Sequence, residues 1–174
     1  MTVYTIGHST RTIPEFEALL LEHDIALVAD VRSIPRSRTN PQFNLDALPA
    51  ALEELGIAYQ HFPELGGRRH HPRGAPPSPN TFWHNDSFRN YADYAASEPF
   101  RAGLRRLRDL AAERRCAIMC SEAVWWRCHR RIISDYLLAE GVPVTHIMGP
   151  GRTEPATLTP HARPLSNGTL VYRA

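Results

Sequence analysis

Short apolar runs alternate with amphipathic stretches along this chain. The apolar runs are typical of short buried strands and cover residues 3–6, 26–29, 57–62, 117–119 and 144–148. After the fourth run, apolar residues fall on one helical face at Ile132, Ile133, Tyr136 and Leu137. This alternation of strands and helices predicts an α/β fold with a mainly parallel sheet and helices on both faces.

Helix signals fill the intervals between the predicted strands. Thr12 and Glu15 have the spacing of a capping box, which places the start of the first helix. Further helices are predicted over residues 44–55, 88–96 and 100–113. Pro49 favours a kinked or late start for the second helix, and Pro99 is expected to separate the last two.

Two segments have neither pattern and are expected to be irregular. Residues 63–86 form a long loop rich in proline, arginine and histidine, which is either a flap that encloses a ligand or a mobile surface insert. The tail over residues 149–174 is expected to cross the surface, with a small edge strand at residues 170–172. No internal repeat is present, so residues 1–174 are interpreted as a single α/β domain.

Composition narrows the class of protein. With 174 residues, of which 43% are hydrophobic, the chain is long enough for a single core. No apolar run approaches the roughly 18 residues of a membrane span, and residues 1–4 lack the basic lead of a signal peptide. The cysteines Cys116, Cys120 and Cys128 are odd in number, which disfavours a disulfide framework. We therefore expect a cytoplasmic protein with free, metal-bound or catalytic thiols and no membrane partner.

The charge is small, but the residue type that carries it is unusual. All 20 basic residues are arginine, and the net charge is only +2. Genomic nucleotide composition explains much of this bias, because alanine and proline are also abundant. Arg101, Arg105 and Arg108 share the predicted solvent face of one helix. Five other arginines cluster near strand ends, namely Arg32, Arg36, Arg38, Arg127 and Arg130.

Polar residues follow three of the predicted strands at their carboxyl ends. The three clusters are His8-Ser9, Asp30-Val31-Arg32-Ser33 and Cys120-Ser121-Glu122. Because parallel strands end at the same edge of a sheet, we expect one pocket that contains His8, Asp30, Arg32 and Glu122. A helix that starts around Cys128 would add N–H groups that favour an anion.

These residue types indicate thiol or acid–base chemistry on an anion. Cys120 is the candidate nucleophile, because arginines and a helix N-terminus lower the pKa of a thiol, and Glu122 or His129 would carry protons. The candidate catalytic residues are Cys120, Glu122, His129, His8 and Asp30. The candidate substrate-binding residues are Ser9, Arg32, Ser33, Arg36, Gly66, Gly67, Arg127 and Arg130.

Three of the catalytic assignments have a structural alternative. Thiol enzymes with a rhodanese or tyrosine-phosphatase loop place an arginine six positions after the cysteine, but here that position is Trp126 and the arginine is Arg127. Cys120 could equally be a buried packing residue. Asp30 could only hold a neighbouring arginine or N–H group, and His8 could cap the first helix.

A metal site is a further alternative. Cys120, Cys128, His129 and His8 are ligands that zinc accepts. However, no Cys-x-x-Cys pair occurs, and neighbouring residues on a helix diverge by about 100°. Cys128 is therefore interpreted as a core-facing helix residue, with His129 and Arg130 turned towards the pocket. We assign no metal and no cofactor.

The chain resembles a bacterial family of unknown function, domain-of-unknown-function family 488. The resemblance rests on four blocks in the family's order, Thr5-Ile6-Gly7-His8-Ser9, Asp30-Val31-Arg32-Ser33-Ile34-Pro35-Arg36-Ser37, Leu65-Gly66-Gly67, and Cys120-Ser121-Glu122 with Cys128-His129-Arg130. It runs from Thr5 to about His146. It implies an α/β fold and marks signature residues, but it supplies no substrate.

Two function classes follow from these features. The first is a small cytoplasmic enzyme, a hydrolase or transferase, that acts on a phosphate-bearing substrate such as a nucleotide or nucleic-acid component. The second is a noncatalytic nucleic-acid-binding module. In the second class, phosphates would contact Arg36, Arg38, Arg68, Arg69 and Arg73, and bases would stack on Trp83, Trp125 or Trp126. The sequence leaves the oligomeric state open.

Overall fold

One central sheet organises the computed structural model, which describes residues 1–174. Its six strands have the order β3-β2-β4-β1-β5-β6, and every neighbouring pair is parallel except β5 and β6. The strands are β1 (Val3–Gly7), β2 (Leu27–Asp30), β3 (Ala58–His61), β4 (Cys116–Cys120), β5 (Val144–Gly149) and β6 (Arg152–Pro155). The predicted α/β fold with a mainly parallel sheet is confirmed.

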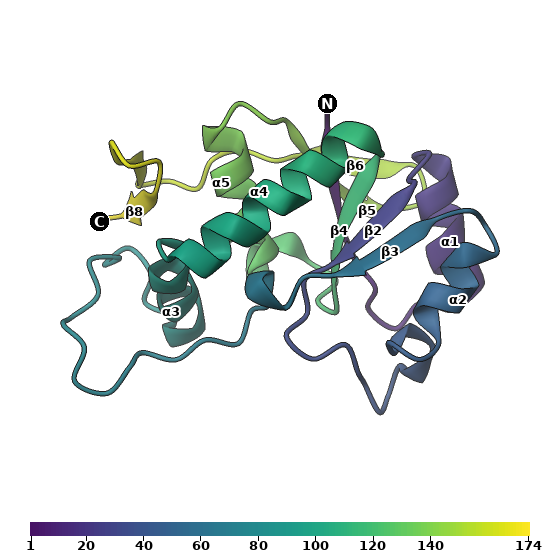
Figure 1. The fold of residues 1–174 in the computed structure, drawn as a ribbon, viewed down its shortest axis with the longest axis horizontal. Coiled ribbons are helices and arrows are strands. Elements are labelled where there is room, and N and C mark those ends of the chain that lie inside the picture. Colours follow the sequence, from purple (N-terminus) through teal and green to yellow (C-terminus); the bar gives the residue numbers. More distant parts are fainter.

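Helices cover both faces of the sheet (Figure 1). They are α1 (Ile13–Glu22), α2 (Leu48–Glu53), α3 (Asp86–Ala95), α4 (Glu98–Glu113) and α5 (Arg130–Ala139). Buried apolar residues of α1 and α2 share one core, and those of α3, α4 and α5 share a second core on the opposite face. None of these helices combines the length and the apolar character that crossing a membrane requires.

Strand β4 shows why a central strand of this sheet is apolar along its whole length. All five of its residues are buried. Cys116, Ile118 and Cys120 pack in the core beneath α3, α4 and α5, whereas Ala117 and Met119 pack in the core beneath α1 and α2. A strand that is covered on both faces has no polar side, so it reads as a continuous apolar run.

The predicted bounds of α2, α3 and α4 lie within four residues of the observed ones. The Thr12 side chain accepts the Glu15 N–H group and the Glu15 carboxylate accepts the Thr12 N–H group, which confirms the capping box. The second helix starts late, at Leu48. Pro99 does not separate α3 from α4 as expected, because it lies in the first turn of α4, where a missing N–H group costs nothing.

The tail contains more regular structure than its composition predicts. β6 pairs antiparallel with β5, while β7 (Ala162–Pro164) pairs with β8 (Leu170–Tyr172) in a separate sheet. The strand at residues 170–172 is confirmed, but the expectation of an otherwise irregular tail is wrong. β6 escaped prediction because all four of its residues are exposed, so no apolar period marks it.

The strand order opens a crevice above β4. The chain leaves the neighbouring strands β1 and β2 towards α1 and α2 on one face, but leaves β4 towards α5 on the opposite face. Loops that diverge in this way leave space at the carboxyl edge, where open α/β sheets bind ligands. Gly7 is in register with Cys120, and Asp30 with Met119, so the three strand ends are adjacent, as predicted.

Candidate functional site

A cavity of about 400 Å³ lies at the carboxyl end of β4. Loops that follow β1, β2 and β4 bound it, and α3 contributes Ser87, Phe88 and Tyr91. The start of the 63–86 loop also forms a wall, through Gly67 and Arg68. This part of the long loop therefore takes part in enclosing the cavity.

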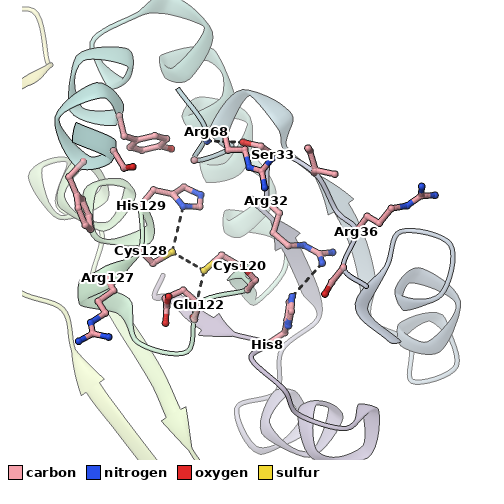
Figure 2. Close-up of a pocket in the computed structure, with 17 residues that line it drawn as sticks. His8, Arg32, Ser33, Arg36, Arg68, Cys120, Glu122, Arg127, Cys128 and His129 are labelled. Atoms are coloured by element: carbon pink, nitrogen blue, oxygen red, sulfur yellow. Dashed lines mark hydrogen bonds between the residues drawn. The ribbon is translucent and has the colours of Figure 1, made fainter. Parts of the chain in front are cut away.

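Two thiols lie side by side in the cavity wall (Figure 2). Cys120 ends β4, Cys128 precedes α5, and their sulfur atoms are 2.8 Å apart. The Cys120 sulfur also lies 3.7 Å from the carbonyl oxygen of Glu122. A thiol carries one hydrogen, and Cys120 can direct it to this carbonyl or to the Cys128 sulfur.

Hydrogen-bond donors converge on the sulfur of Cys128. Besides Cys120, the backbone N–H group of Arg130 donates to it at 3.4 Å and the Arg130 Nε–H group at 3.5 Å. Burial opposes ionisation, but the hydrogen bond from Cys120 and the charges of His129 and Arg130 outweigh it and hold the pKa of Cys128 well below its usual value. Burial and the neighbouring Cys128 raise the pKa of Cys120 well above its usual value. The geometry thus favours Cys128 as the thiolate, whereas the sequence pointed to Cys120.

The imidazole of His129 is held in one orientation beside this thiolate. Its Nε2–H group donates to the carbonyl oxygen of Val31 at 2.7 Å. Its Nδ1 atom faces the Cys128 sulfur at 3.5 Å, and the Tyr91 ring packs edge-on at 5.1 Å. His129 can therefore exchange a proton with Cys128 while a backbone carbonyl orients the ring, which is the arrangement of an activated thiol.

Gly66 and Gly67 let the loop after β3 reach the site. A Cβ atom on Gly67 would lie 2.6 Å from Nδ1 of His129, and one on Gly66 would lie 2.5 Å from the Ser33 hydroxyl oxygen. That hydroxyl accepts the backbone N–H group of Arg68 at 2.9 Å. The two glycines permit close backbone packing, and of the two only Gly67 also lines the cavity.

His8 is buried in the cavity wall as a neutral imidazole. Burial, together with the charge of Arg32, lowers the pKa of His8 to about 4. The hydrogen bond to the Ser9 carbonyl acts in the opposite direction but is outweighed. The Nδ1–H group donates to that carbonyl at 2.8 Å, which leaves the Nε2 lone pair facing Arg32 Nη1 at 3.4 Å. At neutral pH the Nε2 atom therefore carries no proton that it could donate as an acid.

The carboxylate of Asp30 is fully buried, and its oxygens are occupied. It accepts Arg32 Nε–H at 2.9 Å and Nη2–H at 2.7 Å, together with the Tyr59 hydroxyl. It does not belong to the cavity lining. The geometry therefore favours the structural interpretation, in which Asp30 positions Arg32 beside His8.

Arg130 lies beneath the thiols and has only 1% of its surface exposed. Its Nη1 group donates to the Thr5 hydroxyl at 3.1 Å and its Nη2 group donates to the Glu122 carbonyl at 2.7 Å. The Thr5 hydroxyl in turn lies 2.6 Å from His146 Nδ1. The expectation that Arg130 faces a ligand is wrong, because its guanidinium supplies positive charge under Cys128 instead.

Three arginines at the rim have guanidinium groups without a partner. Arg36, Arg68 and Arg127 line the cavity and are exposed, and their side chains form no hydrogen bond or ion pair within the protein. Glu122 is the only carboxylate in the lining. Free guanidiniums are complementary to phosphate and carboxylate groups, so the mouth of the cavity favours an anion.

Most of the predicted site residues meet at this cavity. Those in its lining are His8, Arg32, Ser33, Arg36, Gly67, Cys120, Glu122, Arg127 and His129. Asp30, Gly66 and Arg130 lie behind the lining. Ser9 is also outside it, but its carbonyl accepts from His8 and its N–H group donates to the Ser121 carbonyl.

Eight residues of the lining are not among the predicted site residues, namely Ile34, Ser37, Arg68, Ser87, Phe88, Tyr91, Ser121 and Cys128. Phe88 and Tyr91 lie on a correctly predicted helix, but no sequence signal shows that this helix meets the strand ends. Cys128 was predicted to face the core from a helix, and it does pack in the core beneath α3, α4 and α5, with 5% of its surface exposed. In the structure α5 begins two residues later, at Arg130, so Cys128 faces the cavity from the preceding turn.

The tryptophans are mainly packing residues. Trp83 is 6% exposed and stacks on Phe88, and Trp125 stacks on His146 and donates to Glu154. Trp126 alone of the three is strongly exposed. No group of three or more His, Cys, Asp or Glu side chains is arranged to hold a metal ion.

Comparison with known proteins identifies a family model that covers most of this site. The model described as "Domain of unknown function DUF488" matches residues 12–137 of the 174-residue chain. This span contains both thiols, His129 and the pair of Asp30 and Arg32, whereas His8 precedes it. No curated protein and no solved structure matches the chain.

Proposed function

We propose that this chain, which belongs to the DUF488 family, is an enzyme that binds a phosphate-bearing anion in the cavity and attacks it with the Cys128 thiolate. The observation that carries the proposal is the convergence of donors on Cys128, beside His129 and beneath a rim of unpaired arginines. The reaction is a hydrolysis or a group transfer. We place the enzyme in the cytoplasm, where free thiols persist.

In the proposed reaction, Cys128 is the nucleophile and His129 transfers the protons. The Cys128 sulfur forms a bond to the electrophilic atom of the substrate, and the electron pair of the broken bond goes to the leaving atom. His129 gives its Nδ1 proton to that atom. Water in a hydrolase, or an acceptor hydroxyl in a transferase, then attacks the adduct. His129 takes up the attacking proton, and the thiolate is released.

The rim and the walls supply substrate recognition. Arg36, Arg68 and Arg127 would hold the anionic group, while Phe88 and Tyr91 offer an apolar wall for the rest of the molecule. A cavity of about 400 Å³ suits a small molecule such as a nucleotide rather than a polymer. The packed state of Trp83 and Trp125 gives little support to a nucleic-acid-binding module.

Thiol labelling tests this proposal. An ordinary thiol with a pKa of about 8.5 loses about eightfold in alkylation rate between pH 8 and pH 7, because its thiolate fraction falls. Cys128 should keep most of its rate with iodoacetamide over this interval, and glutathione serves as the reference thiol. An alkylation rate of Cys128 that falls as steeply as that of glutathione would contradict a thiolate at this position and with it the proposed mechanism.

Anion protection tests the binding part of the proposal. Pyrophosphate should slow the alkylation of Cys128 in the wild-type chain, and the double variant Arg36→Ala, Arg127→Ala should lose this protection. Arg105→Ala, on α4 and paired with Glu98, is the matched control and should keep it. Equal protection in both variants would show that the rim arginines do not bind the anion.

A further inference from the structure

We propose that Cys120 and Cys128 form a reversible disulfide, in which a hydroperoxide oxidises Cys128 first and Cys120 is the resolving thiol. This inference goes beyond the proposed function. It shares the Cys128 sulfur with that function, but it needs neither the phosphate-bearing substrate nor the rim arginines.

The two sulfurs are already placed for bond formation. They are 2.8 Å apart and both thiols are free, whereas a disulfide bond is about 2.0 Å long, so the sulfurs need to approach by only about 0.8 Å. Cys120 ends a strand and Cys128 precedes a helix, and the two residues are eight positions apart in the chain. Cys116 is also free and buried, but it lies outside the cavity lining and provides an internal control.

Access to the pair favours a small oxidant. Only 2% of Cys120 and 5% of Cys128 is exposed, yet both residues belong to the lining of a cavity of about 400 Å³. A hydroperoxide can enter this cavity, whereas a disulfide carried by another folded protein cannot approach so deeply buried a sulfur. Donors around Cys128 favour the charged sulfur, and thiolates are the form that reacts with peroxides.

The chemistry balances with a hydroperoxide and a dithiol. The Cys128 thiolate attacks the terminal oxygen of ROOH, the O–O bond breaks, and the alkoxide takes a proton to leave as ROH. Cys128 is then a sulfenic acid. The Cys120 sulfur attacks the Cys128 sulfur, the S–O bond breaks, and the oxygen leaves as water with the proton from Cys120. In total, two thiols and ROOH give one disulfide, ROH and water, and a dithiol reduces the disulfide by exchange.

The disulfide would silence the thiol chemistry of the site. It would consume the Cys128 thiolate and tie the end of β4 to the start of α5. The segment between the two cysteines, which carries Glu122 and Arg127 of the lining, would become a closed loop. Reduction by a dithiol would restore both the thiolate and the open segment.

Mass spectrometry of the full-length chain tests the inference. The reduced protein is treated with one equivalent of hydrogen peroxide at pH 7, quenched with N-ethylmaleimide and mapped by peptides. We expect the loss of two hydrogen atoms, a bond between Cys120 and Cys128, a free Cys116, and full reversal by dithiothreitol. Cys116→Ala should behave like the wild type. Persistent free thiols at both positions, or a bond that includes Cys116, would overturn the inference.

Two variants separate the attacking from the resolving thiol. Cys120→Ser should accumulate a sulfenic acid at Cys128 that dimedone traps, whereas Cys128→Ser should consume peroxide at least about tenfold more slowly than the wild type, as expected when the thiolate is removed. A wild-type chain that retains a dimedone-reactive Cys128 would show that Cys120 does not resolve it. Circular dichroism checks both folds, and the wild-type disulfide map is decisive even if a variant fails to fold.

Pyrophosphate binding, measured on the same reduced protein, keeps the two proposals apart. A disulfide that forms in a chain that does not bind pyrophosphate would leave the redox inference standing without the proposed function. Pyrophosphate binding by a chain that forms no disulfide would overturn the redox inference and leave the proposed function standing.

Discussion

At the scale of single residues, the site depends on how neighbours divide one proton between two sulfurs. Cys120 and Cys128 have the same intrinsic chemistry and are both buried, but Arg130 and His129 stand next to Cys128. Their donors stabilise charge on that sulfur, and Cys120 then serves as a further donor. No spacing rule reveals this asymmetry, because it depends on the turn that carries Cys128 away from the helix.

The two buried histidines predict a pH dependence of stability. Burial, joined by the charge of Arg32 at His8 and of Arg130 at His146, lowers the pKa of each ring from 6.5 to about 4. Between these values the unfolded chain binds a proton that the folded chain does not, so stability falls as the pH drops from 6.5 towards 4. Each ring contributes at most about 3 kcal/mol to this loss, since one pKa unit is worth about 1.4 kcal/mol.

Urea unfolding at several pH values measures this effect. His146→Gln should flatten the dependence between pH 6.5 and 4. His84→Gln replaces an exposed histidine and should leave the dependence as it is in the wild type. A His146→Gln variant with the wild-type slope would contradict the assignment of a buried neutral imidazole at that position.

Asp30 predicts a loss of stability rather than a loss of chemistry. Asp30→Asn would leave Arg32, only 6% exposed, without its charge partner, and breaking a buried pair costs about 3 to 5 kcal/mol. Glu98→Gln breaks the exposed pair with Arg105 and should change the urea midpoint little. Equal midpoints for the two variants would show that the buried pair does not hold the loop after β2.

At the scale of elements, the sequence predicts the strands that a run of apolar residues marks and the helices that a periodic apolar face marks. The central strands are continuous apolar runs because both of their faces are covered, and α4 shows a polar face opposite Leu104, Leu107 and Ala111. The exposed strand β6 has neither pattern, and no local sequence signal indicates that it pairs with β5. The lining residues of α3 were missed for the same reason, since packing decides which helix meets the strand ends.

Gly7 gives the close approach of two elements a direct test. A Cβ atom at this position would lie 1.8 Å from the carbonyl oxygen of Glu122, so Gly7→Ala forces the end of β1 away from the loop after β4. We expect destabilisation by about 2 kcal/mol or more, as overpacking in a buried site produces. Gly149→Ala, where no atom lies within 4 Å of the added Cβ, is the matched control. Similar urea midpoints for the two variants would show that the end of β1 and the loop after β4 are not in tight contact.

At the scale of the whole molecule, topology gathers chemistry that is dispersed along the chain. His8, Arg32 and Cys120 lie at or just after the ends of three strands, and they meet because β4 lies between β1 and β2. The chain leaves β4 towards one face and leaves its neighbours towards the other, which keeps the carboxyl edge open. The sequence predicted this convergence from parallel strands alone. It could not show that Arg130 and Asp30 are buried supports, because burial depends on how the loops close over the edge.

The distribution of charge over the molecule predicts a shallow salt dependence. The net charge is only +2, and the unpaired arginines of the cavity are the three at the rim. A single strand of nucleic acid held by three arginines would show a slope of about −2 in log affinity against log salt, because each neutralised phosphate contributes about −0.7. A binding module that tracks a long strand engages more phosphates and gives a steeper slope.

Titrating a fluorescent oligonucleotide and a fluorescent nucleotide at several salt concentrations separates the two classes. We expect the oligonucleotide to bind no more tightly than the nucleotide, with a slope no steeper than about −2 for either. Tight oligonucleotide binding with a slope well beyond that value, lost in the Arg36→Ala, Arg127→Ala variant but not in Arg105→Ala, would favour the binding module over the enzyme.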